Sequence, residues 1–144
     1  MRLTGTYPRN LDAKGRLSLP AALRKQLSDR VCVMPAPDVD ALYVFTEETH
    51  GAWVDSVFAS KGGYDPTNPD HVQVKEALFA MATTLDIDSA ARITIPEEDR
   101  AEKGIDREVV VIGGDDRLVI WDKEKWEARK AASKNLMADF FSAR

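Results

Sequence analysis

The sequence predicts an α+β protein, mainly β with short helices, that consists of two tandem copies of one unit and ends in a C-terminal helix. Three observations predict this fold class. A ten-residue motif occurs twice, short segments rich in β-branched and aromatic residues follow each occurrence, and helical apolar spacing lies between the copies and at the chain end. The composition, 44% hydrophobic and 31% charged, excludes a fully disordered chain.

The internal repeat has an offset of 76 residues. Its strongest part is residues 11–20 (LDAKGRLSLP), which recur as residues 87–96 (IDSAARITIP). Two further pairs of apolar segments follow in the same order. Residues 41–45 correspond to 117–121 at the same offset, and residues 31–34 resemble 109–112, which are shifted by two more residues. Aligned segments in one order are typical of tandem copies. We therefore assign a first copy to residues 1–60, a linker and helix to residues 61–80, and a second copy to residues 81–144.

Each copy is expected to contain the same elements in the same order. An extended segment enters a loop with an Asp-x-x-x-Arg pattern, and a brief strand of alternating apolar and hydroxyl residues follows. Pro20 and Pro96 then open short helices, because proline loses no hydrogen bond in the first helical turn. Two strands rich in Val, Ile and aromatic residues complete each copy. Thr46 and Asp122 are expected to cap the helices that come next.

Two longer helices are predicted outside the repeated segments. After the turn-rich residues 61–69 we expect a helix that ends at about Ala80, since the repeat requires a strand to begin near Ala82. Its expected apolar face is Val74, Ala77, Leu78, Met81, Ala82 and Leu85. The last helix carries an apolar cluster that has to pack on its own domain or on another subunit: Leu136, Met137, Phe140 and Phe141. Because units this small bury little apolar surface alone, we expect oligomerisation.

Charge is distributed unevenly along the chain. The net charge is −4, yet residues 1–30 hold seven Lys/Arg against two acids, and the remaining residues hold 13 Lys/Arg against 22 acids. A basic end on an acidic body could steer a polyanion to one face, although a solvated basic surface without a ligand would have the same composition.

The first Asp-x-x-x-Arg loop has the chemistry of a DNA contact. Gly15 permits a tight turn and a close approach to phosphate, and Lys14 and the earlier Arg9 are suited to phosphate oxygens. Arg16 presents a planar fork that can bind phosphate or the edge of guanine. The alternative is a local ion pair in which Asp12 staples Arg16 to the loop, and for Asp12 we favour this structural role.

The second loop is expected to contribute less to polyanion binding. It has neither lysine nor glycine, and its one basic residue, Arg92, lies beside Asp86 and Asp88. An ion pair of Arg92 with Asp88 is therefore at least as reasonable for this loop as a DNA contact.

The motifs resemble the MraZ family over nearly the whole chain. The matching segments are residues 4–7 (TGTY), residues 11–20, residues 109–113 (VVVIG), residues 120–122 (IWD) and Trp126. This resemblance implies two tandem swapped-hairpin barrels of the AbrB/SpoVT (double-ψ) type. It also implies a transcriptional regulator that binds direct repeats in double-stranded DNA upstream of the bacterial division and cell-wall gene cluster, as a ring-shaped homo-oligomer, often an octamer, associated with the nucleoid.

The resemblance also implies roles for individual residues. The family's Asp-x-x-x-Arg motifs correspond to Asp12 with Arg16 and to Asp88 with Arg92, and their arginines are implicated in DNA contact. Ala91 stands where the family often has glycine.

Competing functions have weaker support in the sequence. Cys32 lies in an apolar run and is expected to be a buried thiol, while His50 and His71 are expected to be surface helix residues without partners at catalytic or zinc-binding spacing. The tryptophans are expected to be packing residues. We therefore expect no enzyme, cofactor, metal, small-molecule substrate or membrane span, and a cytoplasmic location. The remaining alternative is an oligomeric protein-interaction ring without DNA readout, of which an antitoxin would be a variant.

Overall fold

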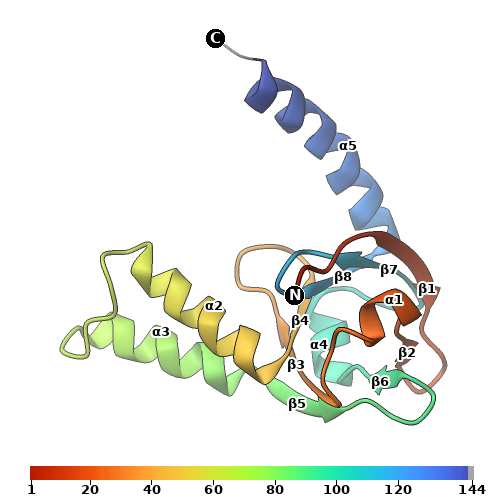
Figure 1. The fold of residues 1–144 in the computed structure, drawn as a ribbon, viewed down its shortest axis with the longest axis horizontal. Coiled ribbons are helices and arrows are strands. Elements are labelled where there is room, and N and C mark those ends of the chain that lie inside the picture. Colours follow the sequence, from red (N-terminus) through yellow and green to blue (C-terminus); the bar gives the residue numbers. More distant parts are fainter. Residues whose placement is uncertain (143–144) are drawn as a thin grey trace.

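The computed structural model describes residues 1–142, so residues 143 and 144 of the predicted second copy lie outside the described residues. It is a mixed α+β fold with antiparallel sheets, short helices and a C-terminal helix, which confirms the fold class at this level (Figure 1). The elements are β1 (Thr6–Asn10), β2 (Arg16–Ser18), α1 (Ala21–Arg24), β3 (Arg30–Pro35), β4 (Leu42–Phe45), α2 (Glu47–Ala59), α3 (Pro69–Ala80), β5 (Thr83–Asp86), β6 (Arg92–Thr94), α4 (Glu97–Glu102), β7 (Glu108–Gly113), β8 (Leu118–Asp122) and α5 (Lys123–Phe141).

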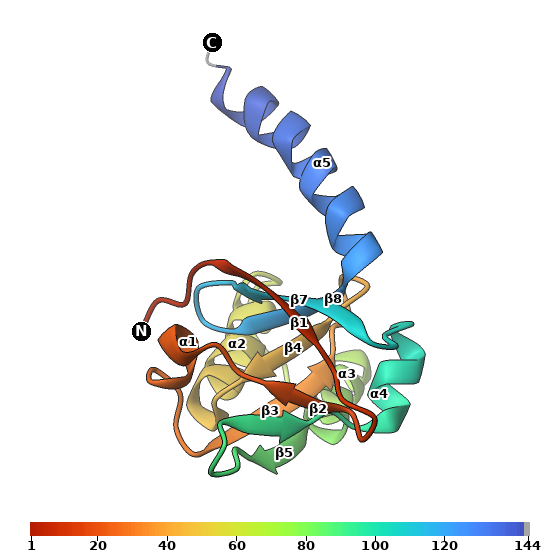
Figure 2. The ribbon, with the colours of Figure 1, turned by 90° about the vertical axis from the view of Figure 1, so that its right-hand side faces the viewer.

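The strands of the two repeated segments are interleaved. A six-stranded sheet has the order β1-β7-β8-β4-β3-β5, and β2 pairs with β6 in a separate two-stranded ribbon. The first strand of each copy therefore pairs with the third strand of the other, β1 with β7 and β5 with β3 (Figure 2). Matching backbone bonds of 2.8 Å follow each exchange, from Leu11 N–H to the Arg107 carbonyl and from Ile87 N–H to the Asp29 carbonyl.

The main core lies between these strands and contains residues of both copies. Leu17 and Ile93, from the two strands of the ribbon, are buried in it together with Val33, Val111 and Ile120. Burying side chains of this size contributes about 1.5–3 kcal/mol each. Because both copies supply this core, the apolar side of the ribbon is held against the large sheet.

A second core cluster fills the space between the sheet and α2. It includes Cys32, Phe45 and Trp53, as expected for a buried thiol and a packing tryptophan. The prediction that His50 is a surface residue is wrong, because only 3% of it is exposed. Its Nε2 lies 3.2 Å from the Leu78 carbonyl of α3. The packing of α3 on α2 thus buries His50, which the sequence alone indicated to be exposed to solvent.

The predicted caps are confirmed, and the predicted face of α3 is partly wrong. The Thr46 side chain accepts the N–H of Thr49 in a capping box, and the Asp122 carboxylate accepts the N–H of Lys125. Helix α3 ends at Ala80 as expected, but Leu78 is its one buried residue. Leu85 belongs to β5 instead, because pairing with β3 requires an extended backbone there. Within residues 1–142, no helix combines the length and the apolar character needed to cross a membrane.

Candidate nucleic-acid interface

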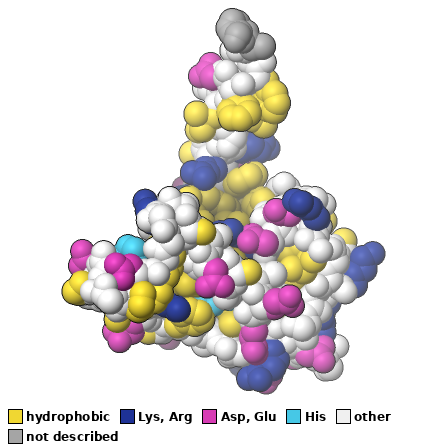
Figure 3. Space-filling model, turned by 60° about the vertical axis from the view of Figure 1, so that its left-hand side comes forward, with side chains coloured by type: hydrophobic (Ala, Val, Ile, Leu, Met, Phe, Trp, Pro, Cys, Tyr) yellow, Lys and Arg dark blue, Asp and Glu magenta, His cyan; other side chains and the backbone are white. Residues whose placement is uncertain are grey.

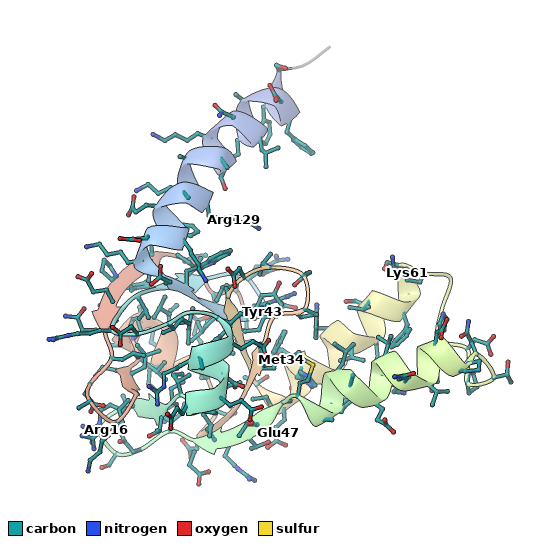
Figure 4. The ribbon with its side chains drawn as sticks, turned by 180° about the vertical axis from the view of Figure 1, so that it is seen from behind. Arg16, Met34, Tyr43, Glu47, Lys61 and Arg129 are labelled. Atoms are coloured by element: carbon teal, nitrogen blue, oxygen red, sulfur yellow. The ribbon has the colours of Figure 1, made fainter. Side chains whose placement is uncertain are left out.

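The β2–β6 ribbon places the arginines of both motifs on one exposed face. Its register pairs Arg16 with Thr94, Leu17 with Ile93, and Ser18 with Arg92. Residues directly opposite each other in an antiparallel pair share a face, and the faces alternate along the strand. The two arginines and the two hydroxyl residues therefore lie on the outer face, while Leu17 and Ile93 point into the core. Figure 4 shows Arg16 at the edge of the body, away from Arg129 on α5 and Lys61 at the α2–α3 turn.

The two loops that lead into the ribbon have the same hydrogen-bond pattern. Asp12 Oδ1 accepts the N–H groups of Lys14 and Arg16 at 2.9 Å, and Asp88 Oδ1 accepts those of Ala90 and Arg92 at 2.9 Å. These bonds fix the backbone of each loop through its own aspartate.

The second oxygen of each aspartate holds the arginine side chain. Arg16 Nε donates to Asp12 Oδ2, and Arg92 Nε donates to Asp88 Oδ2 at 3.1 Å. About a third of each arginine side chain stays exposed, 34% for Arg16 and 35% for Arg92. The bond from the backbone N–H of Arg16 lowers the pKa of Asp12, and that from Arg92 lowers the pKa of Asp88. The carboxylates of Asp12 and Asp88 are thus charged at neutral pH.

The residue before each arginine has a left-handed backbone. Gly15 has φ of +77° and Ala91 has φ of +60°. The carbonyl of Gly15 accepts the N–H of Ile95, and the carbonyl of Ala91 accepts the N–H of Leu19, both at 2.9 Å. The missing glycine in the second loop therefore leaves the loop geometry unchanged. An L-residue in this conformation costs about 1–2 kcal/mol, which a glycine avoids.

Arg100 of α4 was not assigned a role from sequence, yet it contacts the first loop. A Cβ on Gly15 would lie 2.8 Å from the Arg100 guanidinium, so the lack of a side chain at Gly15 makes room for it. Arg100 Nε also donates to the Ile95 carbonyl at 3.1 Å. Its one signal in the sequence is that Arg100 lies 76 residues after Arg24, which is the offset of the repeat. Arg100 of the second repeated segment thus packs against the loop of the first.

The predicted basic residues are only partly brought together. Lys14 is exposed in the loop beside Arg16, and Arg92 lies on the same ribbon. Arg9 belongs instead to β1 in the six-stranded sheet, where its guanidinium donates to the Pro8 carbonyl at 2.8 Å. Within residues 1–142, no group of three or more His, Cys, Asp or Glu side chains could hold a metal ion.

Comparisons with known proteins agree with the family resemblance. The family model described as "MraZ protein, putative antitoxin-like" matches residues 3–50 and 78–141, which contain the two repeated segments. The chain is 31% identical to the transcriptional regulator MraZ of Dehalococcoides mccartyi, covering 90% of this chain and 89% of that protein. It is 35% identical to the protein of the same name from Clavibacter michiganensis, covering 94% and 91%. The corresponding Corynebacterium urealyticum protein is also 35% identical, over 94% and 90%. These matches confirm the family and, with it, the prediction that the chain is not an enzyme.

Proposed function

We propose that this chain, which belongs to the MraZ family, is a transcriptional regulator that binds double-stranded DNA through the outer face of the β2–β6 ribbon. The observation that carries the proposal is the placement of Arg16, Ser18, Arg92 and Thr94 on one exposed face. A two-stranded ribbon fits the major groove, where arginine binds guanine and hydroxyl groups bind bases or phosphates.

The ion pairs leave both arginines able to bind a ligand. Asp12 and Asp88 use the Nε atoms, and among the described residues no other protein acceptor bonds to either guanidinium. The terminal nitrogens remain available for the two parallel bonds that guanine or phosphate accepts. An aspartate that holds an arginine in one rotamer also reduces the entropy lost when DNA binds. The staple and the DNA contact are therefore compatible roles of the same side chain.

The two loops are expected to contribute unequally. Lys14 adds a phosphate-binding charge beside Arg16, whereas Ala90 occupies the equivalent position in the second loop. Asp86 is close to the second loop in sequence, and its Oδ1 lies 3.4 Å from Nε of Arg30. We therefore assign the larger share of DNA affinity to Arg16 with Lys14 and Gly15, a smaller share to Arg92, and a peripheral phosphate contact to Arg9.

The exchange of first strands between the copies supports a swapped-hairpin barrel of the AbrB/SpoVT type. The family membership supports a homo-oligomeric ring that is cytoplasmic and associated with the nucleoid. Its proposed targets are direct DNA repeats upstream of the division and cell-wall genes. A ring would present several identical ribbons, which suits a repeated DNA target. A protein-interaction ring without DNA readout is the competing function.

The test is DNA-binding titration with the region upstream of the chain's own gene cluster. Arg16→Ala should weaken binding about 5- to 150-fold, the equivalent of about 1–3 kcal/mol for a bidentate contact. Arg92→Ala should weaken it less. The slope of the logarithm of the binding constant against the logarithm of the salt concentration should become shallower by about 0.9 for each phosphate that a variant no longer neutralises. Lys61→Ala, which removes one charge far from the ribbon, is the matched control (Figure 4).

Two results would contradict the proposal. Equal losses of affinity from Arg16→Ala and Arg92→Ala would remove the assigned asymmetry. A wild-type chain that binds its upstream DNA no better than unrelated DNA would favour the protein-interaction ring.

A further inference from the structure

The distal half of α5 carries exposed apolar side chains, and neither core cluster of the described residues includes them. Leu136, Met137, Phe140 and Phe141 are 69%, 55%, 84% and 76% exposed. Their spacing places them on one side of the helix, which we call the α5 stripe. Near its start, the same helix is covered, because Trp126 packs near Trp121 of β8 and Arg129 lies over the Trp121 ring at 5.2 Å. Exposed apolar side chains clustered in this way mark an interaction surface.

A second exposed apolar surface lies on the α2–α3 hairpin. Val72 and Phe79 are 42% and 48% exposed and lie two turns apart on one side of α3, with Glu76 between them. We call these three residues the α3 stripe. Figure 3 shows hydrophobic side chains over the hairpin and along α5 (Figure 3).

The two surfaces carry opposite charge. The hairpin, residues 47–80, holds six acidic residues against two lysines, while α5 holds five basic residues against three acids. Lys130 and Lys134 flank the α5 stripe, and Glu76 lies within the α3 stripe. Opposite charges around apolar patches favour mutual docking and disfavour the pairing of either surface with a copy of itself.

The two surfaces of one chain do not meet. Helix α5 spans about 28 Å, at 1.5 Å per residue, and leaves the body in a direction different from that of the hairpin (Figures 1 and 4). A contact between them therefore requires two chains. When this contact is repeated head to tail it is heterologous, and contacts of this kind form closed rings when the rotation between subunits closes.

We propose that the α5 stripe of one chain docks on the α3 stripe of a second copy of this chain. This inference names the contact surfaces of the homo-oligomer in the proposed function and rests on that oligomer. It assigns oligomerisation to helices that lie outside the β2–β6 ribbon, so the ribbon remains open for DNA.

The first test measures the mass of the full chain in solution by light scattering. Wild type should exceed the 16.0 kDa of one chain, and Phe140→Asp should shift the mass toward that of one chain. Asn135→Asp adds the same charge on the opposite face of α5 and should leave the mass unchanged. Because Phe140 is 84% exposed, its substitution leaves the folded core intact. A monomeric wild type, or an unchanged mass for Phe140→Asp, would overturn the inference.

The second test identifies the partner surface. A Phe140→Cys chain and a Val72→Cys chain, carrying different tags and expressed together, should be joined by a short bismaleimide. Asn135→Cys with Val72→Cys should react much less, and wild type reports any background from the buried Cys32. Products that join only Phe140→Cys chains to one another would show α5–α5 pairing and overturn the inference, as would the absence of any product.

The outcome is separable from that of the DNA proposal. Arg16→Ala should keep both the wild-type mass and the cross-link. If wild type forms the cross-link but binds no DNA, the proposed function fails while the docking surfaces stand. If DNA binds without the cross-link, the docking surfaces are wrong.

Discussion

Gly15→Ala should destabilise the protein in two separate ways at the first loop. The alanine residue must adopt the left-handed backbone conformation with φ of +77°, and its Cβ would lie 2.8 Å from the guanidinium of Arg100. Arg100 can move, because the atoms involved are at the end of a flexible side chain. The hydrogen bond from its Nε to the Ile95 carbonyl, 3.1 Å long, is then broken.

The magnitude follows from these contributions. The left-handed conformation costs about 1–2 kcal/mol for an L-residue, and the stiffer unfolded chain returns about 0.4–1 kcal/mol. Loss of one hydrogen bond adds about 0.5–1.5 kcal/mol. Gly15→Ala should therefore lower the free energy of unfolding by about 2 kcal/mol, within a range of about 0.5–3 kcal/mol. With a urea m-value of about 2 kcal/mol/M, the urea midpoint falls by about 1 M.

The assay is urea denaturation at one fixed protein concentration, since oligomers change stability with concentration. Ala91→Gly is the matched substitution in the second loop, because Ala91 already has φ of +60°. It should leave the free energy of unfolding unchanged or raise it by up to about 1.6 kcal/mol. In an Arg100→Ala background, Gly15→Ala should be less destabilising. The reasoning is refuted if Gly15→Ala has no effect, or if both substitutions destabilise equally.

Two further predictions concern pH. The backbone N–H groups of Arg16 and Arg92 lower the pKa values of Asp12 and Asp88 below 3.8. The stabilisation from these hydrogen bonds is therefore present above pH 3.8 and is lost as the pH falls through the lowered pKa values. NMR titration should give both carboxyl groups midpoints below pH 3.8, and a midpoint above pH 3.8 would contradict these hydrogen bonds. Burial lowers the pKa of His50 below 6.5, so its stabilising effect is present above 6.5 and is lost as pH falls toward the lowered value. The urea midpoint should therefore drop between about pH 7.5 and about pH 5.5 in wild type and drop less in His50→Phe, and identical pH profiles would argue against a buried neutral ring.

Local sequence features determined most of the secondary structure and the loop chemistry. Thr46 and Asp122 were recognisable as caps, because a cap depends on groups three residues away. The ion pairs of Asp12 with Arg16 and Asp88 with Arg92 were predictable as local alternatives for the same reason. The repeat identified the two loops as equivalent, and the motifs identified the family.

Only the tertiary structure decided which elements of the two copies meet. Alternation of apolar residues predicts strands but does not choose their partners, because partners are selected by hydrogen bonds and packing between distant segments. The pairing of β2 with β6 is what puts Arg16 and Arg92 on one face, and α3 is what buries His50. The contact of Arg100 with Gly15 and the exposure of Phe140 likewise depend on how distant segments pack, so the sequence by itself indicates candidate residues but not the surface that they share.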